Sequence, residues 1–175
     1  NRAMKIKLNL SDAGIKQAQK EYDEWRKTLE TRIERFVKKL SDTGAEVAKL
    51  RFTAAIYDGD MSDIAVGVEL DGKKATVYAT GQAVAFIEFG TGVAFAEHPS
   101  GMYAHGTYGR GQGTKPNGWV YKGVPGPTAQ PVYNRLGEQK PDVWRTKGNP
   151  PACAMWESTA QMAASIKTVW EEVMR

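Results

Sequence analysis

The spacing of hydrophobic and polar positions changes several times along the chain, and each spacing predicts a different element. From residues 4–10 apolar and polar residues alternate, which is typical of a half-buried strand. Ser11 or Asp12 then supplies a side-chain oxygen suited to capping a helix start. Steps of three and four follow and predict a long amphipathic helix, whose apolar stripe comprises Ile15, Ala18, Tyr22, Trp25, Leu29, Ile33, Phe36 and Leu40.

The long helix is expected to bend or break at Asp42-Thr43-Gly44, because glycine is the usual helix terminator. Residues 45–56 can resume a helix with an apolar face of their own. The stripe could serve a coiled coil, but for a single-domain protein we favour packing on the chain's own sheet.

Two apolar runs, residues 64–70 and 75–79, flank Asp71-Gly72 and predict a β-hairpin. Asp-Gly suits a type I′ turn, whose two central residues both have positive φ. Residues 83–89 fit either a short strand or a helical turn, and their period does not decide between the two.

Residues 90–151 are rich in glycine and proline and lack helical periodicity. Such a stretch far exceeds the usual connection length, so it is either functional or mobile, with one short strand at Trp119-Val120-Tyr121. Pro150-Pro151 ends it and leads into a last helix over residues 153–175. The apolar face of that helix comprises Met155, Thr159, Met162, Ala163, Ile166, Val169, Trp170 and Val173. We predict that Trp25, Leu29, Phe36, Ile166 and Trp170 are largely buried.

Length and composition indicate one globular domain. The chain has 175 residues, of which 41% are hydrophobic and 25% charged. Residues 1–3 precede Met4 and are interpreted as a tag remnant, so the domain is assigned to residues 4–175. No apolar run suits a membrane span or a secretory signal, and a single cysteine favours a reducing cytoplasm. The net charge of +4 is too small to identify a partner. We expect an α+β fold, with a long N-terminal helix and a C-terminal helix packed on a small, mainly antiparallel sheet.

Few residues suggest catalysis. His98, His105 and Glu97 could supply three metal ligands, but no helix or strand pattern fixes them together, so we disfavour a metal site. Cys153 stands at a helix start, which can lower a thiol pKa, yet a packing role is favoured. Residues 109–113 match neither a P-loop nor a dinucleotide fingerprint. We therefore expect no enzyme activity and no cofactor.

Aromatic and basic residues in the glycine-rich stretch allow two interpretations. Arg110, Trp119 and Tyr121 suit nucleic acid, through charge and stacking. The same composition suits a loop that orders against a protein partner, and we favour this second interpretation.

One stretch is more specific: Phe86-Ile87-Glu88-Phe89-Gly90-Thr91-Gly92. This signature is one of several features that follow one another along the chain. Before it come an amphipathic helix leading to Asp42-Thr43-Gly44 and a hairpin. After it come a variable loop at about residues 93–149, then Gly148-Asn149-Pro150-Pro151-Ala152, and then a last helix. This ordered set, covering residues 4–175, resembles the tail-component family of long-tailed bacteriophages and prophages, known as tail-completion, neck or head–tail joining proteins.

The motif also has a direct physical interpretation. Gly90 and Gly92 permit backbone angles closed to other residues, and Thr91 can hydrogen-bond nearby backbone. Glu88 is suited to cap neighbouring amides or to pair with a basic residue, and Phe89 completes the signature. A sharp corner that launches a long loop explains the same residues and is compatible with an assembly role.

The resemblance implies a structural subunit of a homo-oligomeric ring at the head–tail junction. Its partners would be connector or head-closure proteins and tail-terminator or tail-tube proteins, with DNA passing through the ring lumen and no membrane involved. It would be made in the host cytoplasm and end in the virion. Candidate interface residues are Phe95, Tyr103, Tyr108, Arg110, Trp119 and Tyr121. The alternatives are a nucleic-acid-binding accessory protein and a hydrolase using Glu88 with His98 or His105.

Overall fold

The computed structural model describes residues 11–96, 98–101 and 115–175, and its elements confirm the α+β expectation. The strand predicted over residues 4–10 lies outside the described residues. Within them, no helix is both long and apolar enough to cross a membrane. In chain order the elements are α1 (Asp12–Thr53), β1 (Ala65–Asp71), β2 (Lys74–Thr80), α2 (Val84–Phe89), β3 (Trp119–Lys122), β4 (Gln130–Tyr133), β5 (Gln139–Thr146) and α3 (Ala154–Met174).

Helix α1 begins as predicted, with the Ser11 side chain accepting a hydrogen bond from the Gly14 amide at 3.2 Å. It then runs for 42 residues without interruption, so the predicted break at residues 42–44 is wrong. Gly44 is instead a packing glycine. A Cβ atom placed there would stand 2.6 Å from Met162 Sδ and 2.9 Å from Ser158 Oγ, which shows how closely α3 approaches.

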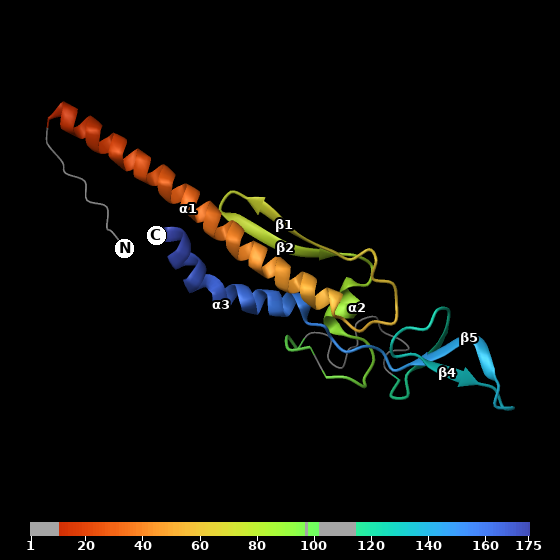
Figure 1. The fold of residues 1–175 in the computed structure, drawn as a ribbon. Helices are drawn as coiled ribbons and strands as arrows, with labels where there is room; N and C mark the ends of the chain where they lie inside the picture. Colours follow the sequence, from red (N-terminus) through yellow and green to blue (C-terminus); the bar gives the residue numbers. More distant parts are fainter. Residues whose placement is uncertain (1–10, 97, 102–114) are drawn as a thin grey trace.

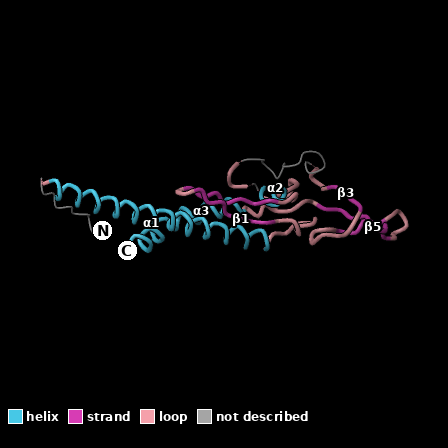
Figure 2. Tube along the Cα trace, turned by 90° about the horizontal axis from the view of Figure 1, so that it is seen from above, coloured by secondary structure: helices cyan, strands magenta, loops and turns pink. Residues whose placement is uncertain are grey.

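Helix α3 runs antiparallel to α1 along its C-terminal half, and the β1–β2 hairpin lies on another side of the same half (Figure 1). Polar contacts mark the antiparallel alignment: Arg32 Nη1 donates to Met174 O at 3.1 Å, and Arg51 pairs with Glu157 at 3.4 Å. Near the hairpin turn, Lys73 Nζ lies 3.3 Å from a Glu30 oxygen. The N-terminal part of α1 projects past both neighbours, which gives the molecule its elongated outline (Figure 2).

The predicted hairpin is confirmed, with β1 and β2 antiparallel from Ala65 opposite Thr80 to Asp71 opposite Lys74. Its tight turn lies one residue later than predicted, at Gly72-Lys73, and positive φ occurs at Gly72 alone. The undecided segment that follows is helical and forms α2.

The glycine- and proline-rich stretch contains a three-stranded antiparallel sheet of order β3-β5-β4. The strand predicted at Trp119 is confirmed as β3, whereas β4 and β5 were not predicted. Each carries a proline, Pro131 or Pro141, and most of their residues are exposed, so no apolar alternation reveals them. The sheet lies at the end of the molecule opposite the tip of α1 (Figure 1).

The core among the described residues is small and centres on Phe52, Ala83, Ile87 and Ala154. The set predicted to be buried is largely wrong: exposed fractions are 42% for Trp25, 49% for Ile166 and 42% for Trp170, while Leu29 and Phe36 are half-buried. Trp25 precedes the stretch of α1 that α3 and the hairpin cover. On α3 the buried positions are Ala154, Ser158, Val169 and Val173, so Ile166 and Trp170 lie outside its most buried stripe.

Candidate functional site

Glu88, near the end of α2, caps the start of α3. Its Oε2 accepts a hydrogen bond from the Met155 amide at 2.9 Å, and its Oε1 accepts one from the Trp156 amide at 3.1 Å. These amides belong to the first turn of a 21-residue helix, where amides lack partners within the helix and the dipole favours a negative charge. Glu88 is 5% exposed, so this carboxylate joins two helices inside the protein.

His98 completes the surroundings of that carboxylate. Its Nε2 lies 3.2 Å from Glu88 Oε1, and its Nδ1 accepts a hydrogen bond from the Ser100 amide at 3.2 Å. An accepting Nδ1 leaves the ring proton on Nε2, so His98 donates from Nε2 to Glu88. The imidazole packs edge-on against the rings of Phe89 and Trp156, with centroids 4.9 and 5.9 Å away.

Gly90 and Gly92 are required by close backbone approach as well as by conformation. Their φ angles are +73° and +80°. A Cβ atom at Gly92 would stand 2.0 Å from Lys147 O, and one at Gly90 would stand 2.7 Å from Pro151 N. No other residue fits here unless the chain separates.

Thr91 and Asn149 join the segment of Gly90 and Gly92 to the segment from Lys147 to Pro151. The Thr91 amide donates to Asn149 O at 3.0 Å, and the Asn149 amide donates back to Thr91 O at 3.2 Å. Asn149 Nδ2 also donates to Phe86 O at 3.1 Å. We call residues 88–92, His98, residues 147–149 and the first turn of α3 the clasp, because together they fix α2, the second sheet and α3 to one another.

The clasp is suited to holding elements together. Both Glu88 oxygens accept hydrogen bonds, and the Glu88–His98 pair is buried, so the hydrolase alternative has no accessible pair here. His105 lies outside the described residues, and no three metal-ligand side chains gather within the described ones. Burial, followed by the charges of Glu88 and Glu157, raises the pKa of the Cys153 thiol, opposite to the effect expected of a helix start.

The candidate interface residues have different surroundings. Phe95 and Thr128 line a hollow of about 200 Å³, and Trp119 lines a separate groove of about 700 Å³. The Tyr121 hydroxyl accepts a hydrogen bond from the Gly126 amide at 3.2 Å, which gives it a local structural role. Tyr103, Tyr108 and Arg110 lie outside the described residues.

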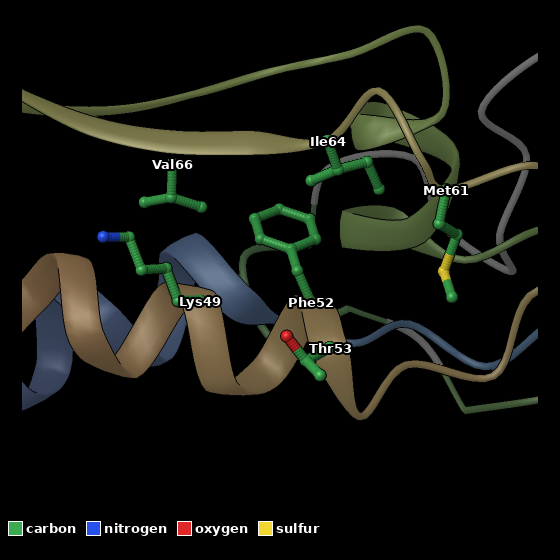
Figure 3. Close-up of a pocket in the computed structure, with 6 residues that line it drawn as sticks. All are labelled: Lys49, Phe52, Thr53, Met61, Ile64 and Val66. Atoms are coloured by element: carbon green, nitrogen blue, oxygen red, sulfur yellow. The ribbon is translucent and has the colours of Figure 1, made fainter.

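A third hollow, of about 290 Å³, opens between α1 and the start of β1 (Figure 3). Phe52 and Lys49 on α1 and Val66 on β1 line it, with Met61 and Ile64 from the connecting segment. It is mainly apolar and borders the core cluster.

Two polar residues with central roles were not singled out from the sequence. Asp58 accepts hydrogen bonds from the Thr128 amide at 2.8 Å and from Thr146 Oγ1 at 2.7 Å, which ties the segment after α1 to the second sheet. Asn149 stands in the Gly148–Ala152 motif described above, but no sequence pattern indicated that it would pair with Thr91. These partners are far apart in sequence, so no local pattern joins them.

Comparison with known proteins finds no family model, no curated protein and no solved structure that matches this chain.

Proposed function

We propose that this protein is a structural assembly subunit of a long-tailed bacteriophage or prophage, acting in the neck or in tail completion. In this role it joins copies of itself into a ring between connector or head-closure proteins and tail proteins, made in the host cytoplasm and carried in the virion. The ordered motifs from residues 42–44 to residues 148–152 support the proposal through the resemblance given above. The clasp gives two of these motifs a shared physical purpose, because the Glu88–Gly92 signature and the stretch at residues 148–152 meet there.

The observation that carries the proposal is the apolar surface of α1. Ile15, Tyr22 and Trp25 are 41%, 49% and 42% exposed on the part of the helix that projects past its neighbours (Figure 1). Exposed large apolar side chains that lie together mark interaction surfaces, and aromatic residues are typical interface anchors. Together with the small core, this surface favours a subunit that gains stability by association.

The test is complementation of a phage that lacks this gene, with joined heads and tails scored by electron microscopy. We expect the double variant Tyr22→Ala/Trp25→Ala to fold normally, because both side chains are exposed. It should nevertheless fail to restore joined particles. The matched control is Arg26→Ala/Lys27→Ala, which changes exposed charged neighbours on the same turns and should complement normally.

Restoration of a normal yield of infectious particles by Tyr22→Ala/Trp25→Ala would remove α1 as the assembly surface. If a long-tailed phage from which this gene has been deleted still assembles intact necks and tails, the proposed function itself is overturned.

A further inference from the structure

One face of the second sheet is exposed and basic. In the β3–β5 register Val120 lies opposite Arg145, and Gln130 of β4 lies opposite the same Arg145. Because directly opposed residues share a face, these three side chains project from one side of the sheet. All three are exposed, whereas Trp119 and Thr146, one position along each strand, are half-buried and buried on the other side.

A groove of about 700 Å³ follows this face. Its lining includes three cations, Lys115, Arg145 and Lys147, two residues with amide side chains, Asn117 and Gln130, and Trp119. No carboxylate lines the groove among the described residues. Two acidic residues lie toward the β4–β5 turn: Glu138 just before β5, which hydrogen-bonds to Asn134, and Asp142 within β5.

The three cations also lack ion-pair partners within the described part of the chain. On the helices, Lys38, Lys39 and Arg51 each pair with a carboxylate, whereas Lys16, Lys27 and Lys167 have no ion pair with the described residues. Positive charges that line one groove without internal partners attract an external anion. Lys147 directly follows β5, two residues after Arg145, so these two cations stand close together along the chain.

We infer that this groove binds the phosphate backbone of nucleic acid, without sequence preference. Lys115, Arg145 and Lys147 would each neutralise a phosphate, while Asn117 and Gln130 donate hydrogen bonds to phosphate or sugar oxygens. A phosphodiester chain carries one charge per nucleotide, so it matches three cations that line one groove better than the isolated carboxylates of a protein partner do. Among the described residues, Val120 and Trp119 are the only large apolar residues that line the groove, so the face offers little to a lipid bilayer. This inference rests on the sheet and is independent of the assembly role.

The experiment measures binding of the full-length protein to a labelled mixed-sequence duplex DNA by fluorescence anisotropy, between about 50 and 200 mM salt. We expect weak binding and a log–log salt slope of about −2.7, since each neutralised phosphate contributes about −0.9. The variant Lys115→Gln/Arg145→Gln/Lys147→Gln should lose most of that slope and bind at least tenfold more weakly at low salt.

The matched control is Lys16→Gln/Lys27→Gln/Lys167→Gln, which removes the same number of exposed positive charges from the helices and leaves the groove unchanged. Circular dichroism and urea unfolding establish that both variants fold. Retention of DNA binding by the control and its loss in the groove variant would support the site. Equal losses in the two variants, absence of wild-type binding at low salt, or binding to anionic phosphatidylserine vesicles but not to DNA would each overturn it.

Discussion

Gly44 of α1 lies against Met162 of α3 so closely that an added Cβ atom would stand 2.6 Å from the methionine sulfur. A larger residue at this position must push the two helices apart. We expect Gly44→Leu to lower the free energy of unfolding by about 1–3 kcal/mol through overpacking, measured by urea denaturation. Gly44→Ala should cost less, because the flexible Met162 side chain can move and alanine favours helix by about 1 kcal/mol. An unchanged stability in Gly44→Leu would mean that α1 and α3 do not pack here.

Ser158 offers a stabilising change at the same helix contact. Its hydroxyl is buried and has no hydrogen-bond partner within the described part of the chain. We expect Ser158→Ala to raise the free energy of unfolding by about 1 kcal/mol, because it removes a desolvated polar group. Thr159→Ala, at an exposed position beside it, serves as the control. A loss of stability in Ser158→Ala would indicate a partner for this hydroxyl.

Removal of the Glu88 carboxylate should loosen the clasp. Glu88→Ala leaves the Met155 and Trp156 amides and the His98 ring without an acceptor, so we expect a loss of about 2–4 kcal/mol in unfolding free energy. Glu88→Gln keeps one carbonyl oxygen and should lose roughly half as much. Glu157→Gln changes a carboxylate of the same first turn that contacts a surface arginine, and should shift stability by less than about 1 kcal/mol. Similar values for Glu88→Ala and Glu157→Gln would contradict the capping role.

Cys153, the single cysteine of the chain, reports on charge near the clasp. Burial and the carboxylates of Glu88 and Glu157 raise its pKa, so at pH 8 less thiolate is present than in an unfolded peptide. We expect iodoacetamide to alkylate the folded protein more slowly than the urea-unfolded chain, as followed by mass spectrometry. Glu157→Gln should speed the reaction of the folded protein, because it removes one charge that raises the pKa and leaves Arg51, which lowers it. A slower reaction in that variant would show that access governs the rate.

Phe36 and Trp170 meet edge-to-face with centroids 5.4 Å apart, which joins α1 to α3 near the surface. Because Trp170 is 42% exposed, neither truncation to alanine should cost what a fully buried aromatic residue does. We expect a coupling free energy of about 0.5–1.5 kcal/mol in a double-mutant cycle of Phe36→Ala and Trp170→Ala. Additive losses would show that the rings do not interact in solution.

The long periodic segments could be predicted from the sequence, and the second sheet could not. A three-to-four spacing over many turns defined α1 and α3, and the Asp-Gly signal found the hairpin. Gly44 was misinterpreted because a glycine that admits a neighbouring helix looks the same in sequence as one that ends a helix. The difference lies in Ser158 and Met162, which are remote in sequence.

The candidate site, too, was predictable from the sequence only in part. The Glu88 to Gly92 motif could be identified from the sequence because closely spaced glycines beside a glutamate have few structural roles. The capping expected of Glu88 is observed, since it accepts a hydrogen bond from the Met155 amide. The partners of the motif, His98 and Asn149, could not be assigned because tertiary contacts select them. The exposure of Trp25 was missed for a related reason: periodicity identifies an apolar face but not how far along it a neighbour extends.

The Thr91–Asn149 bridge also bears on how the protein tolerates changes in length. The chain leaves the body at Thr91 and returns at Asn149, 58 positions later, so the intervening span begins and ends at a single point. The entropy lost in closing such a loop grows only with the logarithm of its length, about 0.6 kcal/mol for each doubling. Insertions and deletions far from the bridge therefore change the closure entropy very little. Natural variants of this chain can be expected to differ most in size between these two residues, while α1, the hairpin and α3 keep theirs.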